Sequence, residues 1–453
     1  MRLLQTRWWL RGSMLAMGAF GAFPSLRGEA EEPNASAAWF RPPVRIAADG
    51  KPIDTGAAWG HSSPALEDLD GDGAKDLVLG DFSGKFQVYR NQATDGGYRF
   101  GKSATLKAGS KDAEVWIYCC IGSQARFGDL DGDGIRDMIS NSYDPGHCYL
   151  FRGLPNHRFA EREELLDKNG TPIRANPVQQ QNYQSFGSFY ELVDWEDDGD
   201  LDVLIGCFDG GMKLRLNEGS STQFAFAGDY VVLEAGGEPM KVAAHLCPVV
   251  ADWDQDGNWD ILAGSDDGSV TWFRNVGAKG KPSFAAGVTL VDKHDGNGYN
   301  LTLWSDEEIR PGIRSQVEVV DFNRDGKLDL IVGDFCTAYD FRPGLNEDDK
   351  SRVKALIEEG ESIGKEYSEK MKALREEFAQ KYPGDAVFSE QADKEWSEAY
   401  RALSQGPEAK KMAEDEKAWV ARIKPFLDTT RGQGDRSFDL AKSHGYLWLF
   451  ERK

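Results

Sequence analysis

The sequence predicts an all-β fold, a β-propeller of five four-stranded blades whose last blade carries an α-helical insertion. Three observations lead to this prediction. An acidic nine-residue motif recurs five times, a short apolar run typical of a strand follows each copy, and the two ends of the chain resemble complementary parts of one blade. Repeated units of this kind are typical of propellers and solenoids.

The first copy of the motif reads DLDGDGAKD and runs from Asp68 to Asp76. Acidic or amide side chains occupy positions 1, 3, 5 and 9, and glycine occupies position 6, where the chain must bend sharply. Successive copies start 61, 65, 58 and 69 residues apart, which leaves room for four strands and their loops. The five motifs, called the first to fifth loops, are Asp68–Asp76, Asp129–Asp137, Asp194–Asp202, Asp252–Asp260 and Asp321–Asp329.

Alternating carboxylates in a tight loop suit Ca²⁺, which takes six to eight oxygen ligands. An EF-hand would need Glu at position 12 and flanking helices, whereas here Asp closes the loop at position 9 and a strand follows. A single copy could be an ordinary Asp/Gly turn, but five copies in register favour up to five Ca²⁺ ions. Glu196 and Asn323 depart from the all-aspartate pattern, so we expect the third and fifth sites to bind differently. The expected ligands, with position 7 acting through its backbone carbonyl, are Asp68, Asp70, Asp72, Ala74 and Asp76; Asp129, Asp131, Asp133, Ile135 and Asp137; Asp194, Glu196, Asp198, Asp200 and Asp202; Asp252, Asp254, Asp256, Asn258 and Asp260; and Asp321, Asn323, Asp325, Lys327 and Asp329.

The strands around the first loop follow a simple order. We expect strands at residues 63–67, 76–80 and 86–91 and a fourth near residues 98–106, and the fourth repeat has the same parts, with its last strand starting near Phe284. Residues 39–46 resemble a fourth strand with nothing before it, and residues 445–450 resemble a third strand with nothing after it. Pairing of these two ends would close a ring and remove exposed sheet edges. An open solenoid is the alternative, but it would not need complementary ends.

The last repeat is interrupted by a helical insertion, expected at residues 345–431, so that the propeller comprises residues 38–335 and 444–453. Apolar side chains between Ile363 and Tyr382 recur every three or four residues, as on one face of a helix, and two further helices follow. This insertion is either an embellishment or an interaction surface.

The N-terminus predicts export. Residues 1–30 read as a signal peptide, with Arg2, Arg7 and Arg11 before an apolar stretch that is too short to span a membrane. We therefore expect a periplasmic or extracellular protein without a membrane span, whose six cysteines form disulfides. The net charge of −22 and the lack of a basic stripe exclude nucleic acid as a partner.

Residues 61–80, HSSPALEDLDGDGAKDLVLG, resemble the FG-GAP / VCBS repeat family, which includes the integrin α-subunit propeller. The resemblance implies a propeller and Ca²⁺ ligation by the loop carboxylates named above. It does not specify one function, because the family spans adhesion domains, sugar-binding modules and accessory domains of secreted enzymes. Many relatives have six to eight blades, so five blades depart from the common case.

The face opposite the acidic loops is the expected binding face, because the longer connections lie there. Five residues stand seven positions before the first Asp of each loop and converge around the axis in a ring: His61, Gly122, Gly187, His245 and Arg314. With Tyr118 and Trp304 nearby, this set suits an anionic or carbohydrate ligand. The alternative is that the charged side chains only satisfy loop carbonyls around the channel.

The sequence thus predicts a secreted, calcium-stabilised module that binds a glycan or an extracellular protein and has no catalytic residues. The alternative is a polysaccharide-active lyase or hydrolase with its site at the axial pocket, where His61, His245 and Arg314 would handle protons and charge. No Ser/His/Asp order or nucleophile elbow supports catalysis, although fold alone does not decide function. A third hypothesis is that the insertion itself docks a partner.

Overall fold

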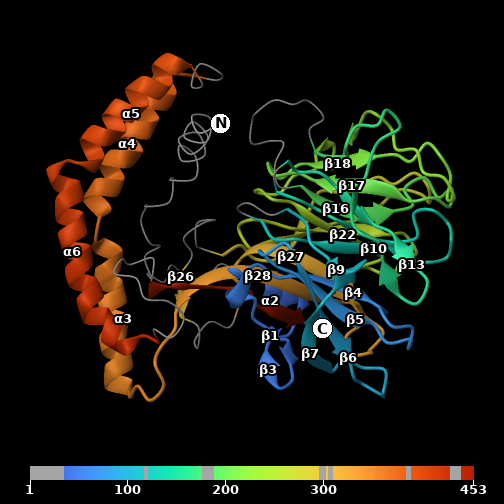
Figure 1. The fold of residues 1–453 in the computed structure, drawn as a ribbon, viewed down its shortest axis with the longest axis horizontal. Helices are drawn as coiled ribbons and strands as arrows, with labels where there is room; N and C mark the ends of the chain where they lie inside the picture. The colour runs from blue at the N-terminus through green and yellow to red at the C-terminus, as the bar shows by residue number, and fades with distance from the viewer. Residues whose placement is uncertain are drawn as a thin grey trace. The chain divides into compact units, whose positions relative to one another are not determined.

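The computed structural model describes residues 35–116, 121–143, 145–175, 188–294, 302–304, 310–383, 389–428 and 440–453. These residues form two compact units (Figure 1). The sheet unit comprises the described residues up to 294, residues 310–336 and residues 443–453, and the helical unit comprises residues 302–304 and the described part of 337–442. The expected signal peptide, residues 1–30, lies outside the described residues. No described helix is both long enough and apolar enough to cross a membrane.

The sheet unit is built around sets of four antiparallel strands, which follow the order of the chain in the first four sheets (Figure 1). In the first sheet, Leu77, Val78 and Leu79 of the second strand are fully buried, which explains why that strand reads as a continuous apolar run. The first four sheets are β4 (Ser63–Glu67), β5 (Asp76–Gly80), β6 (Phe86–Asn91) and β7 (Phe100–Thr105); β10 (Ala125–Gly128), β11 (Asp137–Ser140), β12 (Tyr149–Phe151) and β15 (Glu163–Glu164); β16 (Phe189–Val193), β17 (Asp202–Gly206), β18 (Met212–Arg215) and β19 (Val231–Val232); and β22 (Cys247–Ala251), β23 (Asp260–Gly264), β24 (Val270–Phe273) and β25 (Val288–Val291).

Both ends of the chain enter the last sheet of this unit. Its strands are β27 (Ile313–Val320), β28 (Asp329–Tyr339), β30 (Leu447–Phe450) and β1 (Val44–Arg45). The C-terminal β30 lies between β28 and the N-terminal β1, and Leu449 is the register partner of both Ile331 and Val44. The N-terminal strand therefore completes a sheet that the C-terminal strand leaves open.

The first strands of the sheets contact one another in sequence. β4 contacts β10, β10 contacts β16, β16 contacts β22, β22 contacts β27, and β27 contacts β4. Apolar clusters lie between neighbouring sheets: Tyr190 of the third sheet packs with Ile139 and Leu150 of the second. In the same way, Ile331 and Leu449 of the last sheet pack with Leu77 of the first.

The outer strands differ most from the sequence expectation. The fourth strand of the fourth sheet starts at Val288, whereas Phe284 forms only isolated bridges with Asn275 and Ala235. The reason is a closed turn: the Asn275 side-chain oxygen accepts N–H bonds from Gly277 and Ser283. The hairpin of β2 (Ala47–Ala48) and β3 (Lys51–Pro52) extends the first sheet, because β2 pairs in parallel with β7. The other short elements are the separate hairpins β8 (Lys107–Ala108) with β9 (Lys111–Asp112), β13 (Gly153–Leu154) with β14 (Arg158–Phe159), and β20 (Glu234–Ala235) with β21 (Glu238–Pro239), and the helices α2 (Ala35–Trp39) and η2 (Gly56–Ala58).

The helical unit contains four described helices where the sequence predicted three. The additional helix is α3 (Glu347–Ser362), and Ile363, which was expected inside the next helix, is the extended residue that ends α3. Val353 and Leu356 of α3 pack with Trp419 of α6. The other elements are α4 (Lys365–Lys381), α5 (Glu390–Ser404), α6 (Pro407–Ile423), η5 (Lys424–Phe426) and β26 (Thr302–Trp304), which pairs with the end of β28, and β29 (Lys442–His444) begins at the end of this unit.

Candidate functional site

The first aspartate of each acidic loop organises the loop backbone. In the first loop, Oδ1 of Asp68 accepts the N–H of Gly71 at 2.7 Å, and Oδ2 accepts the N–H of Gly73 at 2.9 Å. Gly73 has φ of +86°, the left-handed conformation that lets the chain turn here. The first Asp of every loop accepts the N–H of the position-6 glycine in the same way, at 2.9 to 3.1 Å.

The last aspartate of each loop ties the loop to the end of the third strand of its sheet, or to the residues that directly follow that strand. Oδ2 of Asp260 accepts the N–H of Trp253 at 3.2 Å, and Oδ1 accepts the N–H of Asn275 at 2.7 Å. The same two bonds are made by Asp76, Asp137, Asp202 and Asp329. These five carboxylates are almost fully buried. Burial raises their pKa, in Asp202 to about 7, although the backbone N–H bonds oppose it.

Three of the loops gather their carboxylates closely enough to share one cation. Ligand atoms of three acidic side chains lie within 4.8 Å of one another in the first, second and fourth loops. Within the described residues, the third and fifth loops form no such group, and these are the loops that carry Glu196 and Asn323. The three groups are Asp68, Asp70 and Asp72; Asp129, Asp131 and Asp137; and Asp252, Asp254 and Asp256.

An arginine at the end of the third strand, or directly after it, accompanies each of these three groups, and the sequence analysis missed it. Arg90 lies 3.5 Å from Asp70, Arg152 lies 2.9 Å from Asp131, and Nε of Arg274 lies 2.5 Å from Asp254. In the third and fifth repeats the same place holds Leu216 and Glu451. Each arginine offsets part of the negative charge that its loop concentrates.

Three residues predicted to converge on the opposite face do meet. Nη1 of Arg314 lies 2.9 Å from Nε2 of His61. Asp266 connects them to His245, because its Oδ1 lies 2.9 Å from Nδ1 of His245 and 3.4 Å from Nε of Arg314. We call His61, His245, Asp266 and Arg314 the axial cluster. His61, His245 and Arg314 have φ of +61°, +49° and +58°, so each holds a left-handed conformation that is unusual for residues with a side chain.

The axial cluster is buried and internally compensated. His61, His245 and Arg314 are 1%, 4% and 6% exposed. Burial raises the pKa of Asp266, but the neighbouring His245 and Arg314 outweigh it and hold that pKa below its usual range. Of the other residues expected here, Gly122 lies next to His61. Tyr118 and Gly187 lie outside the described residues, and Trp304 is described only as backbone in β26.

A second charged group lies where the five first strands meet, and sequence analysis missed it. The Arg126 guanidinium, which is 4% exposed, faces the carboxylates of Glu191 at 2.7 Å and Glu318 at 3.7 Å. It also donates to the carbonyls of Pro64, Pro248 and Val317, so it contacts every first strand. Arg126, Glu191 and Glu318 each stand three positions before the first Asp of a loop, a regularity that could have revealed them.

The disulfide expectation is wrong for three of the six cysteines. Cys148, Cys207 and Cys247 are free thiols and are buried. They pack as small apolar side chains between sheets, as with Cys148 and Cys207 in the cluster around Tyr190. Burial raises the pKa of the Cys207 thiol to about 12 and of Cys247 to about 11.

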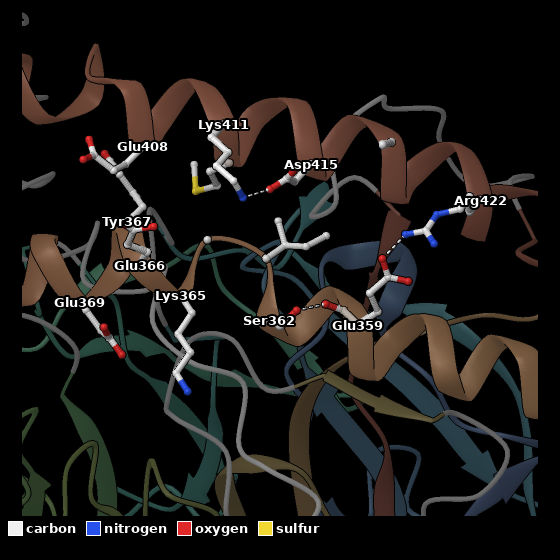
Figure 2. A pocket seen from close by; sticks show the side chains of 14 residues that line it. Glu359, Ser362, Lys365, Glu366, Tyr367, Glu369, Glu408, Lys411, Asp415 and Arg422 are labelled. Carbon is white, nitrogen blue, oxygen red and sulfur yellow. Dashed lines mark hydrogen bonds and ion pairs between the residues drawn. The ribbon is translucent and has the colours of Figure 1, made fainter.

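The helical unit contains a cavity of about 630 Å³ between the α3–α4 junction and α6 (Figure 2). Gly364, with φ of +80°, starts α4 after the break and contacts Met412. Ion pairs border the cavity: Lys411 with Asp415 at 2.7 Å, and Arg422 with Glu359. The sides of the cavity are therefore charged, and the side chains of Tyr367 and Met412 also line it.

The described sheets, the acidic loops and the repeated strand order define a mainly β repeat protein with propeller-like sheets. The model of the FG-GAP-like repeat matches residues 194–263 and 252–332. The third, fourth and fifth loops therefore lie in a segment that is similar to the FG-GAP-like repeat. No curated protein matches the chain.

Solved structures are similar at low sequence identity. A Photorhabdus luminescens Tc holotoxin pore is 17% identical over 60% of this chain and 11% of its own, with a TM-score of 0.31. BBS1N in complex with ARL6DN is 12% identical over 66% of this chain and 70% of its own, with a TM-score of 0.27. A β-fructofuranosidase from Schwanniomyces occidentalis is 7% identical over 69% of this chain and 62% of its own, with a TM-score of 0.29. The chain spans about a tenth of the toxin chain, and these TM-scores are too low to support a closer relationship.

Proposed function

We propose that this chain is an exported, calcium-stabilised β-propeller that serves as a binding module for a glycan or an extracellular protein. The observation that carries the proposal is the loop geometry repeated five times. In each loop one aspartate accepts the position-6 N–H and another joins the loop to the end of the third strand or the residues after it. In the first, second and fourth loops, three carboxylates are thereby held close together before any ion binds. Such preorganised oxygen ligands suit Ca²⁺.

The proposed ring has five blades, with β30 and β1 completing the last one. Two observations support it: the N-terminal β1 pairs with β30, and the first strand of the last sheet contacts the first strand of the first sheet. The apolar cluster of Leu77, Ile331 and Leu449 lies across that junction. Closure of this kind would protect the sheet edges from pairing with other chains.

Calcium would have a structural role in this proposal. The loop carboxylates at positions 1, 3, 5 and 9, with the position-7 carbonyl, would hold the ion and fix the turn between first and second strands. Carboxylates this close repel one another unless a cation lies between them. We propose tighter binding at the first, second and fourth loops, where three carboxylates cluster, than at the loops with Glu196 and Asn323.

The proposed binding face is opposite the acidic loops. The strained backbone at His61, His245 and Arg314 supports this choice, because left-handed residues cost free energy and concentrate at functional sites. In the proposal the axial cluster lies beneath this face and fixes the connections that carry it, with Tyr118 as a further contact. Alanine at His245 or Arg314 should therefore weaken ligand binding, and unchanged binding would remove the axial cluster from the site.

Thermal unfolding in CaCl₂ and in a chelator tests the proposal. A site with free Ca²⁺ at 100 times its Kd contributes about 2.7 kcal/mol, so several sites should raise the Tm by many degrees. Asp70→Asn, which removes a clustered carboxylate, should lower the number of bound ions by one, and Asn323→Asp should tighten the fifth site. Lys327→Ala is the matched control, because the proposal uses only its carbonyl. Equal Tm values with and without calcium would contradict the proposal.

A further inference from the structure

Two tryptophans of the sheet unit are exposed although the other large side chains of their segments are buried. Trp59 is 73% exposed and Trp116 is 60% exposed, whereas Ile53 and Val115 are almost fully buried. Trp59 precedes β4 and Trp116 precedes β10, so both belong to connections that enter a first strand. These connections lie at the end of the sheets opposite the acidic loops. This end of the sheets carries the proposed binding face.

The backbone at Trp59 is strained. Its φ of +70° and ψ of 17° place a bulky aromatic residue in the left-handed region, where such residues are outliers. Gly60 and His61 follow with φ of +84° and +61°, so three consecutive residues are left-handed. Strain of this kind persists only where surrounding contacts enforce it, and it concentrates at ligand sites.

Those contacts are present. The Thr55 hydroxyl donates to the His61 carbonyl at 2.7 Å, and the Thr55 carbonyl accepts the N–H of Gly60 at 3.1 Å. The Thr55 N–H donates to the Gly445 carbonyl at 2.9 Å, which ties the connection to the last sheet. At Gly60 a Cβ would lie 2.6 Å from the His444 carbonyl, so only glycine fits there. The fold therefore fixes the backbone of Trp59 while leaving its ring in solvent.

The backbone next to Trp116 contacts the turn between β5 and β6. The N–H of Val115 donates to the carbonyl of Gly84 in that turn at 2.8 Å. Glu114 forms an isolated antiparallel β-bridge with Lys85 through the backbone. Phe82 of the same turn stacks on His61 with 5.5 Å between ring centroids. Residues next to each exposed tryptophan thus contact one and the same turn, His61 through Phe82 and Val115 through Gly84.

We propose that Trp59 and Trp116 form a platform that binds a saccharide chain by stacking against its sugar rings. The inference rests on the proposed function and names the ligand class and the contact residues of its binding face. The face of an indole ring is electron-rich and attracts the C–H bonds of a sugar ring. Charged groups next to Trp116, including Glu114 and the pair of Lys85 and Asp112 at 2.7 Å, offer partners to sugar hydroxyls.

A protein partner fits this surface less well. Protein interfaces have a contiguous apolar centre that is depleted of charge. Here charged side chains, Glu114, Lys85 and Asp112, lie next to Trp116. The other large exposed apolar residues of the described chain lie outside these two connections, at Val44, Leu166, Val231, Val232, Val276 and Val288.

Native gels that contain a soluble polysaccharide test the inference. The probes are hydroxyethylcellulose, xyloglucan, arabinoxylan, galactomannan, laminarin and alginate, and the readout is retardation relative to a gel without polysaccharide. Trp59→Gly removes the ring and suits the left-handed backbone, Trp116→Ala removes the second ring, and Trp59→Phe retains an aromatic face. Val276→Ala, at an exposed apolar residue outside these connections, is the matched control.

We expect the wild-type protein and Val276→Ala to be retarded by at least one probe. Trp59→Gly and Trp116→Ala should each weaken that binding at least threefold, and Trp59→Phe should retain part of it, with unchanged Tm in calcium for all variants. Equal retardation of wild type and both ring-removal variants would overturn the inference and leave the calcium-stabilised module standing. The inference would also be overturned if no polysaccharide retarded the wild-type protein. It would be overturned as well if removal of the rings weakened binding to a protein partner but not to any polysaccharide. Failure of the proposed function would appear instead as a Tm that is insensitive to calcium.

Discussion

Nε of Arg126 lies 2.7 Å from Oε2 of Glu191, in a buried pair that also faces Glu318. The guanidinium donates to backbone carbonyls of three other first strands, so one side chain joins all five sheets where they meet. Charged groups this deeply buried are tolerated only when they are paired and hydrogen-bonded. A buried charged cluster around Arg126 thus connects the sheets at the centre of the sheet unit, and loss of this cluster should destabilise every sheet.

Replacing Arg126 tests how much this charged cluster contributes to stability. Arg126→Met leaves two buried carboxylates without their cation, so the free energy of unfolding should fall by about 3–5 kcal/mol. Urea denaturation in saturating calcium measures this change in the free energy of unfolding. The control is Arg136→Met, which removes an exposed partner of Glu67 and should cost less than about 1 kcal/mol. A loss below 1 kcal/mol for Arg126→Met would mean that the cluster contributes little.

The same cluster should make stability depend on pH. Burial raises the pKa of Glu191 from 4.5 to about 7, although Arg126 opposes the shift. The folded state then holds a proton that the unfolded state has lost, so the free energy of unfolding should decrease as pH rises from 4.5 to 7. The decrease attributable to Glu191 is at most about 3 kcal/mol and should vanish in Glu191→Gln. Identical pH profiles of the two proteins would contradict this assignment.

Replacing Leu449 tests the proposed closure of the sheets into a ring. Its side chain packs with Ile46, Leu77 and Ile331 between the last sheet and the first. Leu449→Ala should therefore lower the free energy of unfolding by about 2–5 kcal/mol, as for a well-packed core leucine. Val276→Ala, at an exposed position, should cost less than about 0.5 kcal/mol. Similar losses for the two variants would show that the ends of the chain do not close a packed junction.

The buried cysteines should be inert in the native protein. Cys148, Cys207 and Cys247 are inaccessible, and burial raises the pKa of all three thiols, so the reactive thiolate is scarce at neutral pH. A thiol-specific reagent should modify them only after unfolding, and peptide mapping by mass spectrometry identifies each site. Rapid labelling of Cys207 in the folded state would contradict its buried position.

The inner strands were predictable because burial and the motif both constrain them. The expected strands at residues 63–67, 76–80 and 86–91 coincide with β4, β5 and β6. Outer strands such as β25 are short and partly exposed, so their sequence pattern is weak, and a local turn at Asn275 displaced the predicted start.

The candidate site was predictable only where the repeat sets positions in register. Counting seven residues back from each loop found His61, His245 and Arg314, whereas Asp266 enters from the turn between β23 and β24, which that register does not include. The disulfide prediction rested on the expected compartment rather than on packing, and Cys148 and Cys207 occupy apolar positions in the core.

The most direct measurement is an anomalous difference map from crystals of the protein without residues 1–30, grown in millimolar CaCl₂. We predict calcium peaks enclosed by the carboxylates of the first, second and fourth loops, with weaker peaks in the third and fifth, in a ring whose last blade contains β30 and β1. Acidic loops without anomalous density in a well-ordered crystal would contradict the account of this chain as a calcium-stabilised propeller.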